Sequence, residues 1–155
     1  MSKNNNFAVI MAGGIGSRFW PMSQESHPKQ FLDVLGIGKT LIQMTFERLQ
    51  KLVPDAQIYV VTNSKYSGLV KVQLGLPDNQ ILTEPLRKNT TACIAYASHK
   101  IMNLNPEANL IVAPSDHLIM KEDKFVNIVN IALEKANSGD HLVTLGIKPS
   151  RPDTG

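Results

Sequence analysis

The chain alternates between short runs in which nearly every residue is apolar and longer stretches in which apolar residues recur every three or four positions. A strand covered on both faces is apolar throughout, so the short runs predict buried strands. The longer recurrence places apolar side chains on one face of a helix. The predicted strands span 7–11, 57–62, 80–83, 109–113 and 141–147, and the predicted helices span 39–52, 64–74, 90–104 and 123–137.

Alternating strands and helices predict an α/β fold with a mostly parallel sheet. Ligands of such sheets lie outside the carboxyl ends of the strands. Clusters of polar residues follow four of the five predicted strands, at 13–18, 84–91, 114–117 and 146–154. We therefore expect these clusters to meet at one edge of the sheet and to form a single binding site there.

The first cluster is a glycine-rich turn, Gly13-Gly14-Ile15-Gly16, followed by Arg18 and Lys29. Glycine permits positive φ and close approach of another group, because it has no Cβ. Backbone N–H groups at the end of a strand can then converge on a phosphate. An arginine fork and a lysine charge add two cations suited to the same anion. The loop predicts a phosphate site, with a tight strand-to-helix turn as the alternative.

Three familiar glycine motifs do not fit the sequence. A P-loop that ends at Gly38-Lys39-Thr40 would need its first glycine at Asp33. A dinucleotide fingerprint or a kinase glycine loop that begins at Gly14 would need its third glycine at Phe19. If the glycine loop binds phosphate, it therefore does so as part of another glycine motif.

Composition narrows the function classes further. The chain has 155 residues, of which 43% are hydrophobic and 19% are charged, enough for one globular core. A net charge of +3 gives no support for nucleic acid or a membrane surface as a partner, and no apolar run approaches the ~20 residues of a membrane span. A single cysteine, Cys93, and a polar N-terminus without a signal-peptide pattern favour a cytoplasmic protein.

Taken together, the motifs resemble those of the sugar-nucleotide pyrophosphorylases. Gly-Gly-x-Gly-x-Arg is followed by Trp20-Pro21-Met22-Ser23 and by Pro28-Lys29-Gln30-Phe31-Leu32, which look like the mannose-1-phosphate guanylyltransferase branch. The resemblance implies a Rossmann-like three-layer sandwich of the nucleotide-diphospho-sugar transferase type. It also implies transfer of guanylate from GTP to mannose 1-phosphate, which releases pyrophosphate.

The same resemblance assigns roles to individual residues. Arg18 would bind the β- and γ-phosphates, and Lys29 would balance charge near the α-phosphate. Nucleotide binding is assigned to Ala12, Gly13, Gly14, Gly16 and Ser17 in the loop, and to Glu84, Asn89, Thr90 and Ser115 beyond it.

Glu84 begins a stretch, Glu84 to Thr91, that resembles the family's base-binding loop. Guanine presents two adjacent donors, N1–H and the 2-amino group, and one carboxylate can accept from both. Adenine has no such donor pair. We therefore interpret Glu84 as the residue that recognises guanine.

Asp116 lies in Pro114-Ser115-Asp116-His117, which resembles the element in which the family's aspartate holds Mg²⁺. One carboxylate with phosphate oxygens and waters suffices to begin a magnesium site. The family takes a second aspartate from later in its chain, and no residue here matches it. Taken alone, an aspartate after a strand also suits a turn or a helix cap.

The final segment, Gly146 to Gly155, resembles a family motif that normally continues into the sugar pocket. We therefore expect residues 1–155 to form the N-terminal nucleotide-binding half of the catalytic domain, without the sugar-binding half or a C-terminal domain. Two alternatives stay open, a GTP-binding fragment without turnover and a related nucleotidyltransferase for another sugar or base. The sequence also leaves open whether the protein is a homo-oligomer.

Overall fold

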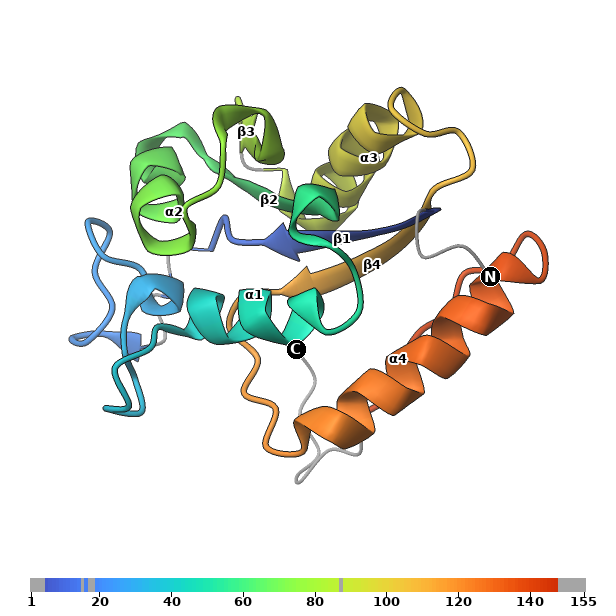
Figure 1. Ribbon diagram of the computed structural model, residues 1–155. Helices are drawn as coiled ribbons and strands as arrows, with labels where there is room; N and C mark the ends of the chain where they lie inside the picture. Colours follow the sequence, from blue (N-terminus) through green and yellow to red (C-terminus); the bar gives the residue numbers. More distant parts are fainter. Residues whose placement is uncertain (1–4, 15, 17–18, 87, 148–155) are drawn as a thin grey trace.

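In the described part of the chain, the fold consists of four parallel strands and four α-helices (Figure 1). The computed structural model describes residues 5–14, 16, 19–86 and 88–147. The strands are β1 (Asn6–Met11), β2 (Ile58–Asn63), β3 (Ile81–Glu84) and β4 (Asn109–Pro114). The helices are α1 (Leu41–Gln50), α2 (Ser67–Leu74), α3 (Asn89–Met102) and α4 (Glu122–Asn137). Four predicted strands and all four predicted helices are confirmed, with boundaries that differ by up to three residues.

The strands lie in the order β3-β2-β1-β4, and every neighbouring pair is parallel. In the central pair, Ala8 of β1 is level with Ile58 of β2. Because all four strands run in one direction, their carboxyl ends share one edge of the sheet. In Figure 1 this edge lies toward the left, where the arrowhead of β1 points.

Helices cover both faces of the sheet, as the apolar strand sequences require. On one face, α1, α2 and α4 pack over side chains that include Ile10 and Val60. On the other face, α3 packs over Val9 and Val61 through residues that include Ala97. Figure 1 shows α3 above the strands and α1 and α4 below them. The α/β fold with three layers predicted from the sequence is therefore confirmed.

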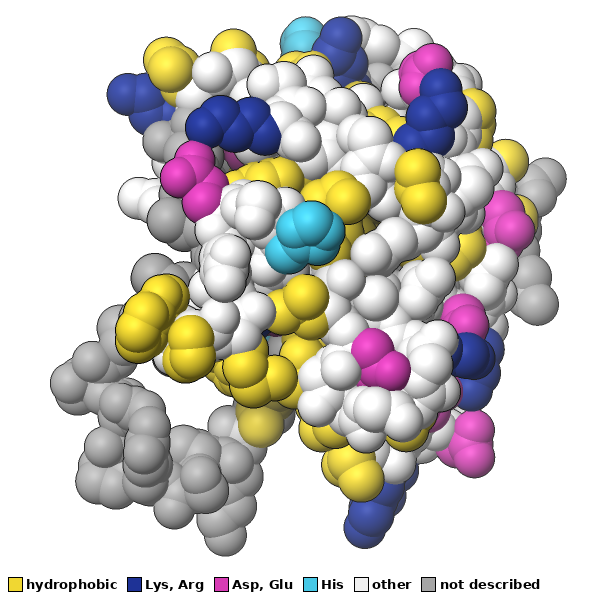
Figure 2. All heavy atoms as spheres, turned by 90° about the vertical axis from the view of Figure 1, so that its left-hand side faces the viewer, with side chains coloured by type: hydrophobic (Ala, Val, Ile, Leu, Met, Phe, Trp, Pro, Cys, Tyr) yellow, Lys and Arg dark blue, Asp and Glu magenta, His cyan; other side chains and the backbone are white. Residues whose placement is uncertain are grey.

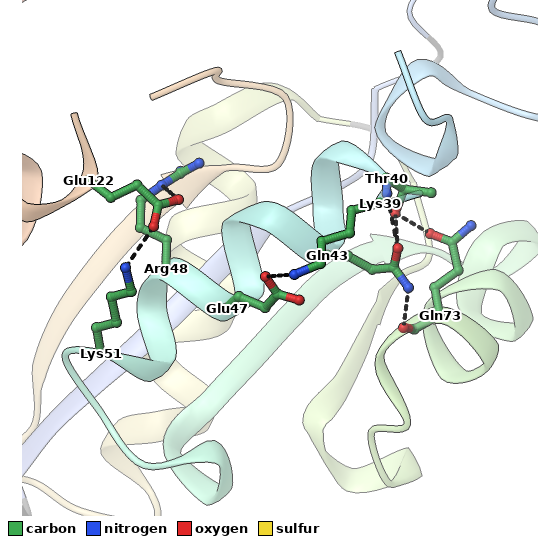
Figure 3. Close-up of polar contacts among 8 residues, drawn as sticks. All are labelled: Lys39, Thr40, Gln43, Glu47, Arg48, Lys51, Gln73 and Glu122. Atoms are coloured by element: carbon green, nitrogen blue, oxygen red, sulfur yellow. Dashed lines mark hydrogen bonds and ion pairs between the residues drawn. The ribbon is translucent and has the colours of Figure 1, made fainter. Parts of the chain in front are cut away.

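Helix α1 makes polar contacts at both ends, with α2 near its N-terminus and with α4 near its C-terminus (Figure 3). At its N-terminus, the Thr40 hydroxyl lies 2.7 Å from Oε1 of Gln73 in α2. Near its C-terminus, Arg48 is 3% exposed and Lys51 follows the helix, and both face Glu122 of α4, at 3.5 Å and 2.7 Å. Burial lowers the pKa of Arg48, while Glu122 acts in the opposite direction.

The predicted fifth strand is wrong for the structure described here. Residues 141–147 form no strand, although their sequence is as apolar as that of a buried strand. A strand needs a neighbour that accepts and donates backbone hydrogen bonds, and no described residue pairs with this segment. Its apolar side chains stay exposed, with Leu142 and Ile147 at 105% and 71%. No helix among the described residues is long and apolar enough to cross a membrane.

Candidate functional site

A cavity of about 560 Å³ opens at the edge of the sheet where the strands end. Figure 2 shows the molecule from this side, with separate groups of hydrophobic side chains in the middle and charged side chains mostly toward the periphery. The lining comes from the last residues of β1, β3 and β4, from the segments after β1 and β4, and from the start of α3. These residues are Met11, Gly13, Gly14, Gly16, Phe19, Lys29, Gln30, Glu84, Asn89, Thr90, Cys93, Pro114, Ser115 and Asp116.

The glycine loop reaches the cavity through Gly13, Gly14 and Gly16. Gly16 has φ +62°, and a Cβ placed there would lie 2.7 Å from Oγ of Ser23. This position therefore excludes larger residues both by backbone conformation and by contact. A Cβ on Gly13 would lie 3.4 Å from Oε2 of Glu84, so the loop passes close to the end of β3.

The floor beneath the loop is a set of buried hydrogen bonds centred on Ala12. The Ala12 N–H donates to the carbonyl of Val61, and its carbonyl accepts from the Thr62 hydroxyl at 2.9 Å. The same carbonyl accepts from Nε2 of Gln30 at 3.1 Å, and Nε2 also donates to the Gly14 carbonyl at 2.8 Å. Ala12 is fully buried, and its N–H is used within the sheet.

Lys29 and Asp116 form an ion pair at the cavity, with Nζ 2.7 Å from Oδ2. The Lys29 ammonium also lies 4.5 Å from the centroid of the Phe19 ring, a cation–π contact. The backbone N–H of Lys29 donates to Oγ of Ser23. Ser115, beside Asp116, is anchored because its N–H donates to the carbonyl of Met11. The pair therefore joins the loop after β1 to the loop after β4.

On the other side of the cavity, Glu84 ends β3 and is 9% exposed. Asn89 and Thr90 begin α3, and Asn89 has φ +63°, the left-handed conformation that asparagine tolerates. Burial, together with the charge of Glu84, raises the pKa of the Cys93 thiol to about 11. The thiol is therefore protonated at neutral pH.

Nine of the predicted site residues line this one cavity: Gly13, Gly14, Gly16, Lys29, Glu84, Asn89, Thr90, Ser115 and Asp116. Ala12 lies beneath it, whereas Arg18 and Ser17 fall outside the residues that the structure describes. The convergence of the loops after β1, β3 and β4 is as expected. A predicted contribution from the segment after 147 also falls outside the described residues.

Sequence reasoning missed the remaining lining residues, which are Met11, Phe19, Gln30, Cys93 and Pro114. Gln30 was named in the sequence analysis only as part of the motif Pro28-Lys29-Gln30-Phe31, on which the family resemblance rests, and no role was assigned to it. Its neighbour Lys29 has an obvious charge, whereas a glutamine has none. Its position is visible only in three dimensions, because its partners lie 16 and 18 residues earlier in the chain.

Asp116 carries one of the two carboxylates among the described residues that line this cavity. Within the described ranges, no three His, Cys, Asp or Glu residues are close enough to hold a metal ion by themselves. The carboxylate already has a cation beside it, the Lys29 ammonium at 2.7 Å. A carboxylate that lines a cavity could supply one oxygen ligand to a divalent metal ion, whose other ligands would have to come from elsewhere.

Comparison with known proteins identifies the family of the chain and the kind of fold it has. Residues 7–155 match the family model described as "Nucleotidyl transferase". The chain is 42% identical over 152 residues to the mannose-1-phosphate guanylyltransferase RfbM of Salmonella typhimurium, covering 95% of this chain and 31% of that protein. It is 39% identical over 150 residues to the xanthan biosynthesis protein XanB of Xanthomonas campestris, covering 95% and 32%.

A solved structure also matches the fold. The chain superimposes on a mannose-1-phosphate geranyltransferase from Thermus thermophilus with a TM-score of 0.75 and 31% sequence identity. The match covers 87% of this chain and 39% of that one. This chain therefore spans about a third of the length of the curated relatives it matches.

Proposed function

This chain belongs to the nucleotidyl transferase family, and we propose that it is the GTP-binding part of a mannose-1-phosphate guanylyltransferase. A phosphate oxygen of mannose 1-phosphate would attack the α-phosphorus of GTP, and the bond from the α-phosphorus to the bridging oxygen of pyrophosphate would break. The products are GDP-mannose and pyrophosphate. The relative from Salmonella typhimurium, named a mannose-1-phosphate guanylyltransferase, supports this choice of reaction.

One observation carries the proposal: a single cavity gathers a glycine loop, a lysine and two carboxylates at the carboxyl ends of parallel strands. Backbone N–H groups and a lysine suit phosphates, and a buried carboxylate suits the donor edge of a base. A cavity of about 560 Å³ is within the usual range for small-molecule sites. These features support assigning one side of the cavity to the phosphates and the other side to the base.

On the phosphate side, we assign the triphosphate to the glycine loop with Lys29, and to Arg18 and Ser17, which follow Gly16 in the sequence. Lys29 would turn from Asp116 toward the phosphates when they bind. Asp116 would hold Mg²⁺, which supplies neutralisation of phosphate charge. Because the attacking group is already an anion, no general base is needed, and alignment with charge neutralisation accounts for most of the catalysis.

On the base side, we assign guanine to Glu84, with Asn89 and Thr90 beside it. The carboxylate would accept from N1–H and the 2-amino group. Glu84 is largely buried at the end of β3, so a correct partner gains more there than it would in water. Our proposal also assigns the protein to the cytoplasm, where a chain with one free thiol stays reduced.

The test has two parts, nucleotide binding and turnover. Calorimetry should show that the chain binds GTP in the presence of Mg²⁺ and binds ATP more weakly. Pyrophosphate release should then be measured after mannose 1-phosphate is added. If this chain binds neither nucleotide, the proposal is wrong.

A second candidate is a GTP-binding unit without turnover of its own. Its support is that the chain spans about a third of its curated relatives. It predicts GTP binding without pyrophosphate release from the 155-residue chain. A panel of nucleoside triphosphates and sugar 1-phosphates separates both from a relative with another base or sugar.

A further inference from the structure

Gln30 holds the glycine loop from below, and its amide nitrogen is used entirely for this contact. The residue is 2% exposed, and Nε2 donates to the carbonyl of Ala12 at 3.1 Å and to that of Gly14 at 2.8 Å. An amide nitrogen carries two hydrogens, so both donors are committed. Both acceptors belong to the segment that leads from β1 into the cavity.

Fixing a carbonyl also fixes the N–H on the other side of the same peptide plane. In a trans peptide the two groups point in opposite directions. Because the Ala12 carbonyl points at Gln30, the Gly13 N–H points away from Gln30, and Gly13 lines the cavity. An anion site built from backbone N–H groups depends on such fixed orientations.

We propose that Gln30 is a positioning residue for the phosphate groups of the bound nucleotide. It acts through the peptide planes of the glycine loop, and the proposal rests on the proposed function in requiring a nucleoside triphosphate in this cavity. The Ala12 carbonyl is also held by the Thr62 hydroxyl, whereas the Gly14 carbonyl belongs to a residue that allows many backbone conformations, so contact with Gln30 restricts it most. Gln30 restores one orientation through its hydrogen bonds to the two carbonyls.

The chain contains a matched control for this role. Gln80 is 6% exposed, and its Nε2 also donates to two backbone carbonyls, those of Asp55 at 2.6 Å and Ile58 at 2.7 Å. These acceptors lie where β2 begins, at the edge of the sheet opposite the cavity. Gln80 therefore makes the same pair of bonds in a structural setting away from the proposed nucleotide site.

The experiment compares Gln30→Met with Gln80→Met, since methionine keeps the volume and removes the donors. The ligands are GTP and guanosine, which share the base and ribose but differ in the phosphates. We expect Gln30→Met to weaken GTP binding about tenfold, the effect of one lost donor orientation, with guanosine binding unchanged. Gln80→Met should leave both affinities unchanged while both variants lower the urea midpoint.

The outcomes separate the two proposals. If Gln30→Met weakens GTP and guanosine equally, or weakens neither, Gln30 is only a structural residue and this inference is overturned. If the unsubstituted chain binds no GTP, the proposed function fails and this inference fails with it. Should Gln30→Met not fold, Gln30→Asn decides, because its shorter amide keeps a donor but cannot hold both carbonyls. Loss of GTP affinity alone supports the inference, and an unchanged ratio of GTP to guanosine affinity overturns it.

Discussion

The two edges of the parallel sheet are built in different ways. At the edge where strands begin, β2 and β3 both follow the sequence Pro-Asp-x-Gln, at 54–57 and 77–80. Each forms one turn of 3₁₀ helix, in which the glutamine N–H donates to the proline carbonyl. At the edge where strands end, β1 continues into a glycine loop, β3 ends in a glutamate, and β4 is followed by Ser115 and Asp116.

This difference separates stability from chemistry. At the starting edge, the same turn precedes β2 and β3, and in each turn the glutamine N–H is hydrogen-bonded to the proline carbonyl. Substitutions there should therefore change folding and leave ligand binding intact. The finishing edge places unlike side chains around a cavity, so substitutions there should change binding more than folding. Stability and ligand affinity can be measured independently on the same variants, which makes the separation testable.

The largest effect should come from truncating the core at the starting edge. Ile58 is fully buried at the first position of β2, and Ile58→Ala should lower the free energy of unfolding by about 3 kcal/mol. Urea unfolding followed by circular dichroism measures this loss. Ile58→Val is the matched control and should cost about 1 kcal/mol. A change in the GTP affinity of the folded variant would contradict the separation.

The next effect is a pH dependence at the finishing edge. Burial and the charge of Glu84 raise the pKa of Cys93 from 9.0 to about 11, so its thiolate is about a hundredfold scarcer at neutral pH than that of an ordinary thiol. Because the pKa is raised, alkylation by iodoacetamide should accelerate about tenfold per pH unit up to pH 10. Mass spectrometry measures the rate, and a plateau near pH 9 would show an unshifted thiol.

Glu84→Gln tests the base side of the cavity. It should reduce the preference for GTP over ATP about thirtyfold, because two hydrogen bonds to a charged acceptor are weakened. Calorimetry with both nucleotides measures the preference. Glu47→Gln is the control, since Glu47 lies on α1 and pairs with Lys39 near solvent. An unchanged preference in Glu84→Gln would show that this residue does not recognise guanine.

The smallest effect returns to the starting edge. Pro77 has φ −71° ahead of β3, and Pro77→Ala should cost about 0.5 kcal/mol, mainly because the unfolded chain gains freedom. Pro54→Ala, with φ −63° ahead of β2, should cost about the same. Unequal losses of unfolding free energy, measured in urea, would indicate that the two turns are not equivalent.

Most of the fold could be predicted from the sequence because most helices and strands are determined by the residues within them. The runs in β1, β2 and β4 are apolar enough to predict strands, and Gly75 marks the end of α2 with φ +66°. The segment 141–147 has a similar composition but forms no strand. A strand also needs a neighbouring strand to pair with, and the sequence of a segment does not show whether one is present.

The candidate site was partly accessible for the same reason. A parallel sheet and the position of the polar clusters after its strands predicted that Lys29, Glu84 and Asp116 would meet at one edge. The ion pair between Lys29 and Asp116 could not be predicted, since it joins side chains 87 positions apart in the numbering (116 − 29). Gln30 was missed because its importance comes from two carbonyls that carry no signal in the sequence.

The contact between Lys29 and Asp116 has a consequence for the way charge enters the cavity. Their side chains are only 19% and 32% exposed, a setting in which a lone charge would lose much of its hydration. Each ion compensates the other at 2.7 Å, so neither stands as an isolated charge. An anion that enters the cavity with its own cation would therefore exchange partners with this ion pair. The anion would pair with Lys29 and the cation with Asp116, so the number of paired charges would stay the same.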